Sequence, residues 1–181
     1  MKQWADCPLR VASLVYFDLE TTGLRPDRGA RIREIAVLAH DGICFDWTWS
    51  EAQKTRPAEH DNAVATQFPT LFAHLQDGVV VGHNLQFDFR FVTYEAERLG
   101  RESLRVRFID TLGLSRRLVS NVPNYELETL LSHFGVAPEE ELHTAVGDVF
   151  ATRTLFWQLV DHGDLDTLAD AGLQPLTWTG A

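Results

Sequence analysis

Two carboxylic acids stand two residues apart where a run of apolar residues ends. Asp18 and Glu20 close the strand-length segment that begins at Ser13. Residues two apart on a strand point to the same face, and neighbouring carboxylates in an apolar setting are costly unless a cation compensates them. Hard cations such as Mg²⁺ prefer oxygen ligands. The pair therefore indicates a cation site, and the alternative is that both acids extend into solvent beyond the strand.

A third carboxylate is expected near the same place. Asp88 follows the short apolar segment 78–82 (GVVVG) and lies about one turn into a helix expected from Asn84, as its cap, to about Leu99. Sites on open α/β sheets gather at the carboxyl ends of the strands. Asp88 is therefore a candidate for the same site, and the alternative is an exposed acid on a capped helix.

A histidine and a fourth carboxylate lie five residues apart further along the chain. His143 and Asp148 would be about 140° apart on a regular helix. We therefore expect His143 in the loop or first turn and Asp148 inside a helix over 144–160. An unperturbed histidine pKa of about 6.5 suits proton removal near neutral pH. The alternative for His143 is a helix cap or a surface position.

The order of the segments predicts a mixed α/β fold. An apolar run from Ser13, a second strand candidate over 32–40, and period-two alternation after the Asp41-Gly42 turn predict three antiparallel strands between Ser13 and about Trp49. Strands and helices then alternate, which favours a sheet covered on both faces. The other expected elements are a loop at 51–61, helices at 62–75 (interrupted or restarted at Pro69), 111–119, 125–134 and 164–171, strands at 78–82 and 105–110, and a tail at 173–181.

Length and composition indicate one globular domain. The 181 residues, with 45% hydrophobic and 23% charged side chains, suit a single domain over 1–181, with a core at about 12–160 and a C-terminal helix and tail at 161–181. No apolar run reaches the ~20 residues of a membrane helix, and no secretory signal is visible. Two cysteines make neither a disulfide framework nor a zinc site. We expect a cytoplasmic protein without a membrane partner.

The net charge of −10 limits the kind of nucleic acid that the chain can bind. Compensating the four acids above still leaves −6, and phosphate binding usually needs a basic surface. Arginines cluster at 25–33 and at 98–107, either to guide a phosphate backbone or as solvated surface. The excess negative charge favours binding of short or single-stranded ends over tight duplex binding.

Together these segments resemble the DnaQ-like 3′–5′ exonucleases, in the DEDDh branch that includes DNA polymerase III epsilon-like and RNase T-like enzymes. The resemblance extends from about Val15 to Phe156. The segments that carry it are 17–24 (FDLETTGL), Gly82-His83-Asn84 with Phe87-Asp88, His143 with Ala145 and Asp148, and the stretch from Tyr125 to Gly135.

The resemblance implies an RNase H-like sheet of about five strands and a role for each matched residue. It implies that His143 takes a proton from the attacking water and that Asp18 bridges two Mg²⁺ or Mn²⁺ ions. The implied metal ligands are Asp18, Glu20, Asp88 and Asp148, and the implied substrate-binding residues are Thr21, Leu24, His83, Asn84 and Phe87.

The predicted function is removal of 5′-mononucleotides from a free 3′ end, most readily of single-stranded DNA. The alternatives are an exoribonuclease or oligoribonuclease, and a non-catalytic module that binds nucleic acid or protein with the same fold. The motifs do not separate RNA from DNA, because recognition of the 2′-hydroxyl depends on the pocket. A polymerase or clamp partner and a homodimer are both left open.

Overall fold

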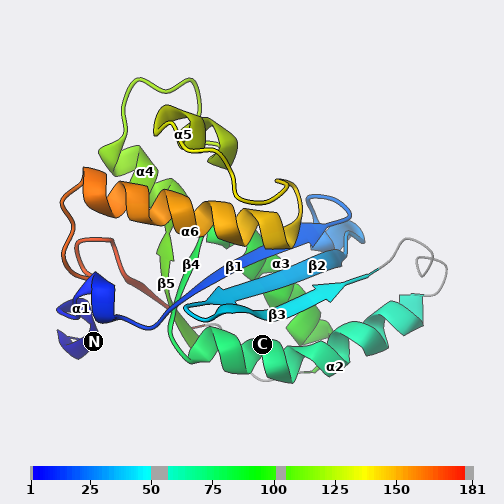
Figure 1. The fold of residues 1–181 in the computed structure, drawn as a ribbon. Coiled ribbons are helices and arrows are strands. Elements are labelled where there is room, and N and C mark those ends of the chain that lie inside the picture. Colours follow the sequence, from blue (N-terminus) through cyan, green and yellow to red (C-terminus); the bar gives the residue numbers. More distant parts are fainter. Residues whose placement is uncertain (1, 50–56, 101–104, 178–181) are drawn as a thin grey trace.

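The computed structural model describes residues 2–49, 57–100 and 105–177. Six strands form one mixed sheet in the order β3-β2-β1-β4-β5-β6 (Figure 1). Strands β1 to β3 are antiparallel, β4 and β5 run parallel to β1, and β6 is antiparallel to β5. Their bounds are β1 Leu14–Thr21, β2 Ile32–Ala39, β3 Gly42–Thr48, β4 Val79–Gly82, β5 Arg105–Asp110 and β6 Gln174–Thr177.

Helices cover both faces of the sheet (Figure 1), which confirms the predicted α/β architecture. Helix α6 lies across one face with α4 and α5, and α2 and α3 lie on the other. In the described parts of the chain, every helix falls short of the length and apolarity needed to cross a bilayer. The bounds are α1 Lys2–Ala5, α2 Pro57–Gln76, α3 Leu85–Arg98, α4 Thr111–Leu118, α5 Leu127–His133 and α6 Ala145–His162, with 3₁₀ turns at Leu9–Val11 and Pro26–Arg28.

The pleat of β1 decides which side of the sheet carries the acids. Leu14 and Tyr16 pack into the core beneath α6, and Val15 and Phe17 pack into the opposite core. Because side chains alternate along a strand, Asp18 and Glu20 continue the face that α6 covers. The core residues of β1 therefore fix where the two carboxylates emerge.

The sixth strand, β6, replaces part of the predicted tail. It pairs with β5 from Arg105↔Thr177 to Phe108↔Gln174. Pro175 lacks a backbone N–H, which is tolerated because β6 lies at the edge of the sheet. The sheet therefore has six strands, not about five.

Helix α2 is longer and more regular than predicted. It begins at Pro57, inside the expected loop, and continues through Pro69 without interruption. Proline in a helix costs about 3 kcal/mol or more, but both sides of Pro69 are anchored by fully buried residues, including Phe68 and Leu71. Residues 50–56 of the expected loop lie outside the described residues.

The helix predicted over 164–171 is wrong, because this segment forms turns bound to the N-terminal region. Leu168 N–H donates to the Cys7 carbonyl at 3.0 Å, and Leu9 N–H donates to the Asp166 carbonyl at 2.9 Å. Asp164 also has a left-handed φ of 49°. The backbone groups of this segment thus pair across the chain, which prevents a continuous helix.

Candidate active site

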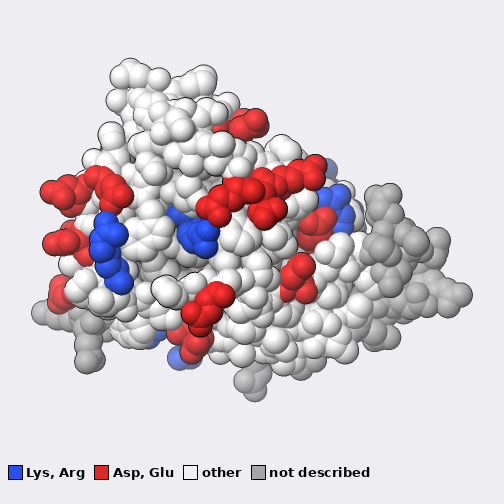
Figure 2. All heavy atoms as spheres, in the orientation of Figure 1, with Lys and Arg blue, Asp and Glu red and all other residues white. Residues whose placement is uncertain are grey.

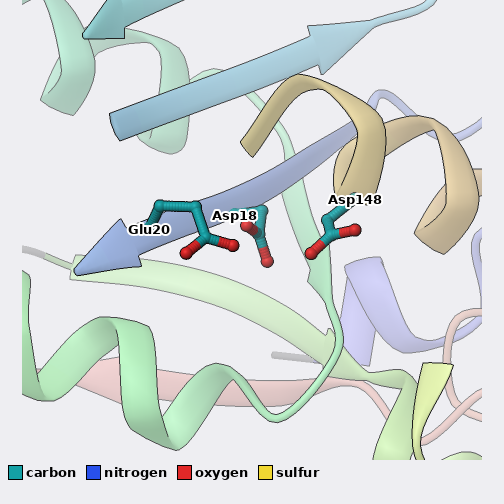
Figure 3. Close-up of side chains that lie close together, drawn as sticks. All are labelled: Asp18, Glu20 and Asp148. Carbon is teal, nitrogen blue, oxygen red and sulfur yellow. The ribbon is translucent and has the colours of Figure 1, made fainter. Parts of the chain in front are cut away.

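Three carboxylates from distant parts of the chain converge at one place. Asp18 and Glu20 come from β1, and Asp148 comes from the first turn of α6. One oxygen from each lies within 4.8 Å of the others, and Figure 3 shows the three groups pointing toward one another. Oxygen ligands at this spacing are suited to a divalent cation.

Asp18 has the least compensated carboxylate of the three. Its Oδ2 is buried without a hydrogen-bond partner among the described residues. Burial raises the pKa of Asp18 well above its usual range, and the charges of Asp88, Asp148, Glu20 and Glu34 raise it further. Burial of an unpaired carboxylate is costly, so this donor set fits a bound cation.

The other two acids have partial compensation. Burial and the charge of Asp148 raise the pKa of Glu20, while Arg33 opposes the shift. The Arg33 Nη2 atom lies 3.4 Å from Glu20 Oε2. Burial also raises the pKa of Asp148, opposed by the backbone N–H and the charge of His143. The site as a whole therefore has excess negative charge.

Asp88 approaches β1 from the other helix layer. It lies in the first turn of α3, is 3% exposed, and its Oδ1 accepts the Leu19 N–H at 3.1 Å. Burial raises its pKa well above the usual range, although the N–H contacts oppose the shift. Asp88 lies outside the three-acid group defined above, but its charge acts on Asp18.

His143 lies before α6, as the five-residue spacing predicted. The helix begins at Ala145 after the cap Thr144. His143 is exposed, has a left-handed φ of 65°, and donates its backbone N–H to Asp148 Oδ1 at 3.2 Å. Together with Asp148 it lines a cavity of about 200 Å³ whose other walls include Glu126 and Leu142. His143 thus borders a space next to Asp148.

Gly147 is a requirement of this turn that the sequence interpretation missed. A Cβ at this position would lie 1.8 Å from the Glu141 carbonyl oxygen. The loop before α6 therefore packs directly against the helix backbone, and only glycine permits this approach. A glycine one residue before a candidate ligand is a weak signal that sequence alone does not distinguish from chance.

Two of the predicted substrate-binding residues lie where β1 ends: Thr21 is its last residue, and Leu24 lies on the loop that follows. Thr21 donates its hydroxyl to the Gly23 carbonyl at 2.8 Å, which closes the turn. Leu24 is 75% exposed, which is unusual for a large apolar residue. Arg90 on α3 lies 3.4 Å from the Leu24 carbonyl and has its guanidinium 5.5 Å from the ring centre of the half-buried Phe87. These contacts bring the β1 loop and α3 together.

His83 and Asn84 hold the β4–α3 junction. The two ring nitrogens of His83 lie 2.9 Å from the Thr111 hydroxyl and 2.9 Å from the Tyr125 carbonyl. Burial lowers its pKa, and a neutral ring with both nitrogens engaged has no free donor for substrate. Asn84 is exposed, has a left-handed φ of 65°, and does not cap α3 with its side chain. Asn84 therefore occupies the predicted N-cap position of α3, but without a capping hydrogen bond from its side chain.

Comparisons with known proteins show the family to which the chain is similar. A family profile described as exonuclease (RNase_T) matches residues 48–156. The chain is 32% identical to a PolC-type DNA polymerase III of Pediococcus pentosaceus over 82% of its own length and 11% of the polymerase. It is 37% identical to the PolC-type polymerase of Listeria innocua over 84% of its own length and 12% of that protein. The chain thus spans only a small part of these relatives.

Solved structures share the fold at low sequence identity. The cell-death related nuclease 4 (CRN-4) superposes with a TM-score of 0.61 and 13% identity, covering 93% of this chain and 81% of that one. NrnC of Brucella melitensis with bound Mg²⁺ superposes with a TM-score of 0.58 and 17% identity, covering 85% of this chain and 75% of that one. The RNase H-like exonuclease fold predicted from the motifs is therefore confirmed.

Proposed function

The chain belongs to the exonuclease family whose profile it matches, and from this premise we propose that it removes 5′-mononucleotides from 3′ ends by metal-dependent hydrolysis. One observation carries the proposal. Asp18, Glu20 and Asp148 bring carboxylate oxygens within 4.8 Å of one another, and the buried Oδ2 of Asp18 has no partner among the described residues. Folding alone disfavours such a group, whereas a nuclease requires one.

The four acids would hold two Mg²⁺ or Mn²⁺ ions. Asp18 lies at the centre of the group and is the candidate to contact both, and Glu20, Asp88 and Asp148 surround it. When bound, such ions stabilise the charge on the attacking and leaving oxygens of a phosphodiester. The chain contributes rigidity, because β1 fixes two of the acids and the first turns of α3 and α6 fix the others.

His143 would accept the proton of the attacking water. Its ring is exposed beside Asp148 at the edge of a cavity, outside the regular part of α6. A base needs access to the reacting water and freedom to reorient, and a position ahead of the helix provides both. The backbone bond to Asp148 keeps the histidine next to the acids.

The terminal nucleotide would lie between the β1 loop and the start of α3. Thr21 and Leu24 border this region from one side, and Asn84 and Phe87 border it from the other. The 75% exposed Leu24 provides an apolar surface for a base. His83 would act indirectly, by holding the Tyr125 segment in place.

Single-stranded DNA is the substrate that we propose. The relatives named above are DNA polymerases, and the net charge of −10 disfavours a long duplex track. Figure 2 shows acidic side chains spread over the drawn face, with basic side chains only as separate patches between them. A short single-stranded end needs only the local site.

We also propose that residues 1–181 act as one exonuclease domain and that a polymerase is a partner. The support is the alignment with 11–12% of polymerase chains, which places this domain type beside a polymerase in those proteins. A clamp or a second copy of the chain is the alternative partner. Co-purification with a polymerase, compared with the isolated chain by gel filtration, would separate these possibilities.

The function is tested by digestion of end-labelled substrates. Single-stranded DNA, duplex DNA with a frayed end and RNA of one sequence are incubated with Mg²⁺, Mn²⁺ or EDTA. We expect stepwise loss of mononucleotides from the 3′ end of single-stranded DNA, no loss in EDTA, and slower loss from the other substrates. Intact 3′ ends in every metal would contradict the activity, and faster digestion of RNA would contradict the substrate.

A further inference from the structure

A fifth carboxylate, Glu34, lies beside the site without joining the group of three acids. It is on β2, directly opposite Glu20 in the antiparallel register. Its strand neighbours on the same face, Ala36 and Leu38, pack beneath α6. Glu34 therefore lies at the junction of β1, β2 and the start of α6.

Both oxygens of Glu34 already have partners within the chain. Oε2 accepts the backbone N–H of Ala145 at 3.2 Å, and Oε1 lies 3.3 Å from Arg33 Nε. Ala145 is the first residue of α6, where backbone N–H groups have no partner inside the helix. The start of α6 and the Arg33 guanidinium therefore both contact the Glu34 carboxylate.

This environment is the opposite of that around Asp18. The Asp18 Oδ2 is buried and has no partner among the described residues, whereas the two Glu34 oxygens contact Ala145 and Arg33. An acid with such contacts is poorly placed to bind a cation but well placed to hold a helix. The helix that it holds carries Asp148 in its first turn and follows His143 directly.

The chain contains a second link from the same residue. Arg33 lies 3.3 Å from Glu34 Oε1 and 3.4 Å from Glu20 Oε2. Glu34 thus connects to one metal-binding candidate through the arginine and to another through the start of α6. The connection to α6 is the one that carries Asp148, so its loss would alter the spacing of the acids.

We propose that Glu34 is a positioning residue that sets the first turn of α6, with Asp148 and His143, at the correct distance from Asp18 and Glu20. This inference rests on the proposed function, because it concerns the same site. Positioning of this kind has large consequences, since a displacement of about 1 Å can cost about 100-fold in rate.

The test compares Glu34→Gln with Glu34→Ala. Glutamine loses the charge but keeps an oxygen that can accept the Ala145 N–H, while alanine loses both. Glu140→Ala, which removes an exposed acid in the loop before α6, is the matched control. Each protein is titrated with Mn²⁺ alone by calorimetry, melted in EDTA, and assayed on single-stranded DNA.

We expect Glu34→Ala to weaken Mn²⁺ binding and to lower kcat by roughly 10- to 100-fold, the usual effect of removing a group that orients metal ligands. KM should change little, because the substrate contacts lie on other elements. Glu34→Gln should stay within about threefold of the unaltered chain, because the acceptor for the helix remains. Glu140→Ala should match the unaltered chain.

Two results would overturn the proposal. Equal losses in Glu34→Gln and Glu34→Ala would mean that the charge itself binds the metal, and wild-type behaviour of Glu34→Ala would mean that the contact is dispensable. If Glu34→Ala does not fold, Glu34→Gln decides alone: a loss of more than tenfold in Mn²⁺ affinity contradicts the positioning role. Because Mn²⁺ binding is measured without turnover, an inactive wild-type chain would reject the nuclease function and leave this comparison interpretable.

Discussion

Two regions of the molecule bury carboxylates, but only one of them supplies the buried acid with hydrogen-bond partners. On α3, Glu95 is fully buried and accepts hydrogen bonds from Arg31 Nε at 2.8 Å and Arg98 Nη2 at 2.6 Å. At the end of β1, Asp18 has a buried oxygen without a partner in the described part of the chain, and further acids surround it. The fold can therefore compensate a buried acid fully, and at the candidate site it does not.

We infer that this difference separates a structural acid, Glu95, from a functional one, Asp18. The Glu95 cluster ties the β1–β2 loop to α3, since Arg31 N–H also donates to the Thr22 hydroxyl oxygen at 2.9 Å. The hydrogen bonds of Glu95 therefore stabilise the position of the β1–β2 loop. The Asp18 group keeps a buried carboxylate oxygen without a partner among the described residues, which is costly for folding and is common at functional sites.

The largest expected effect separates the acids from the base beside them. His143→Ala should lower turnover by about 10²–10⁴-fold, the usual contribution of a general base. Mn²⁺ affinity should stay unchanged, because the acids remain. Rates on single-stranded DNA and Mn²⁺ calorimetry measure the two quantities, with His133→Ala on α5 as the control for removal of an exposed histidine. Undiminished turnover in His143→Ala would end its assignment as base.

The second prediction concerns the compensated acid. Glu95→Gln should lower the free energy of unfolding by about 2–4 kcal/mol, because breaking a buried ion pair leaves its partners uncompensated. Arg31 and Arg98 are partly exposed, so water screens their charges and the loss of stability should lie toward the lower end of this range. Urea denaturation measures it, and Glu97→Gln, at an exposed position of the same helix, should change stability by less than about 0.5 kcal/mol. Equal stabilities for these two variants would contradict the structural role of Glu95.

The third prediction has the opposite sign. Asp18→Asn should stabilise the protein in EDTA by about 1 kcal/mol, because it removes repulsion from the neighbouring acids with little change in shape. With Mn²⁺ the unaltered chain should be the more stable of the two, since only it gains binding energy from the ion. Melting temperatures of both proteins in EDTA and in Mn²⁺ test this crossing. If Asp18→Asn destabilises the protein in EDTA, the site is not strained in the way that we infer.

The sequence predicted the parts of this comparison that depend on local pattern. A strand-length apolar run located β1, and period-two alternation after the Asp41-Gly42 turn located β3. The spacing of His143 and Asp148 correctly separated the loop from the helix. The convergence of Asp18 with Asp148 was expected only through the family resemblance. No local pattern specifies a distance across 130 residues of chain.

The features that the sequence did not predict depend on tertiary contacts. Strand β6 contains Pro175 and has only four residues, so its pairing with β5 leaves no clear pattern. One partner of the His83 ring, the Tyr125 carbonyl, lies 42 residues away, so the sequence alone did not predict this contact. Glu34 resembles an ordinary exposed acid of a strand until α6 is placed above it. In each case the partner, not the residue, determines the role.

The smallest expected effect is a pH dependence of stability that arises at Asp18. The folded-state pKa of Asp18 is raised, so the folded protein binds a proton that the unfolded chain releases near its ordinary pKa of about 4. Stability in EDTA must therefore fall as the pH rises from about 4 through the raised pKa. An asparagine side chain cannot titrate, so Asp18→Asn should show a shallower fall, and its advantage over the unaltered chain should grow toward neutral pH. Urea denaturation in EDTA at several pH values measures the two slopes. Parallel slopes would show that Asp18 is compensated by the fold after all, and the contrast with Glu95 would disappear.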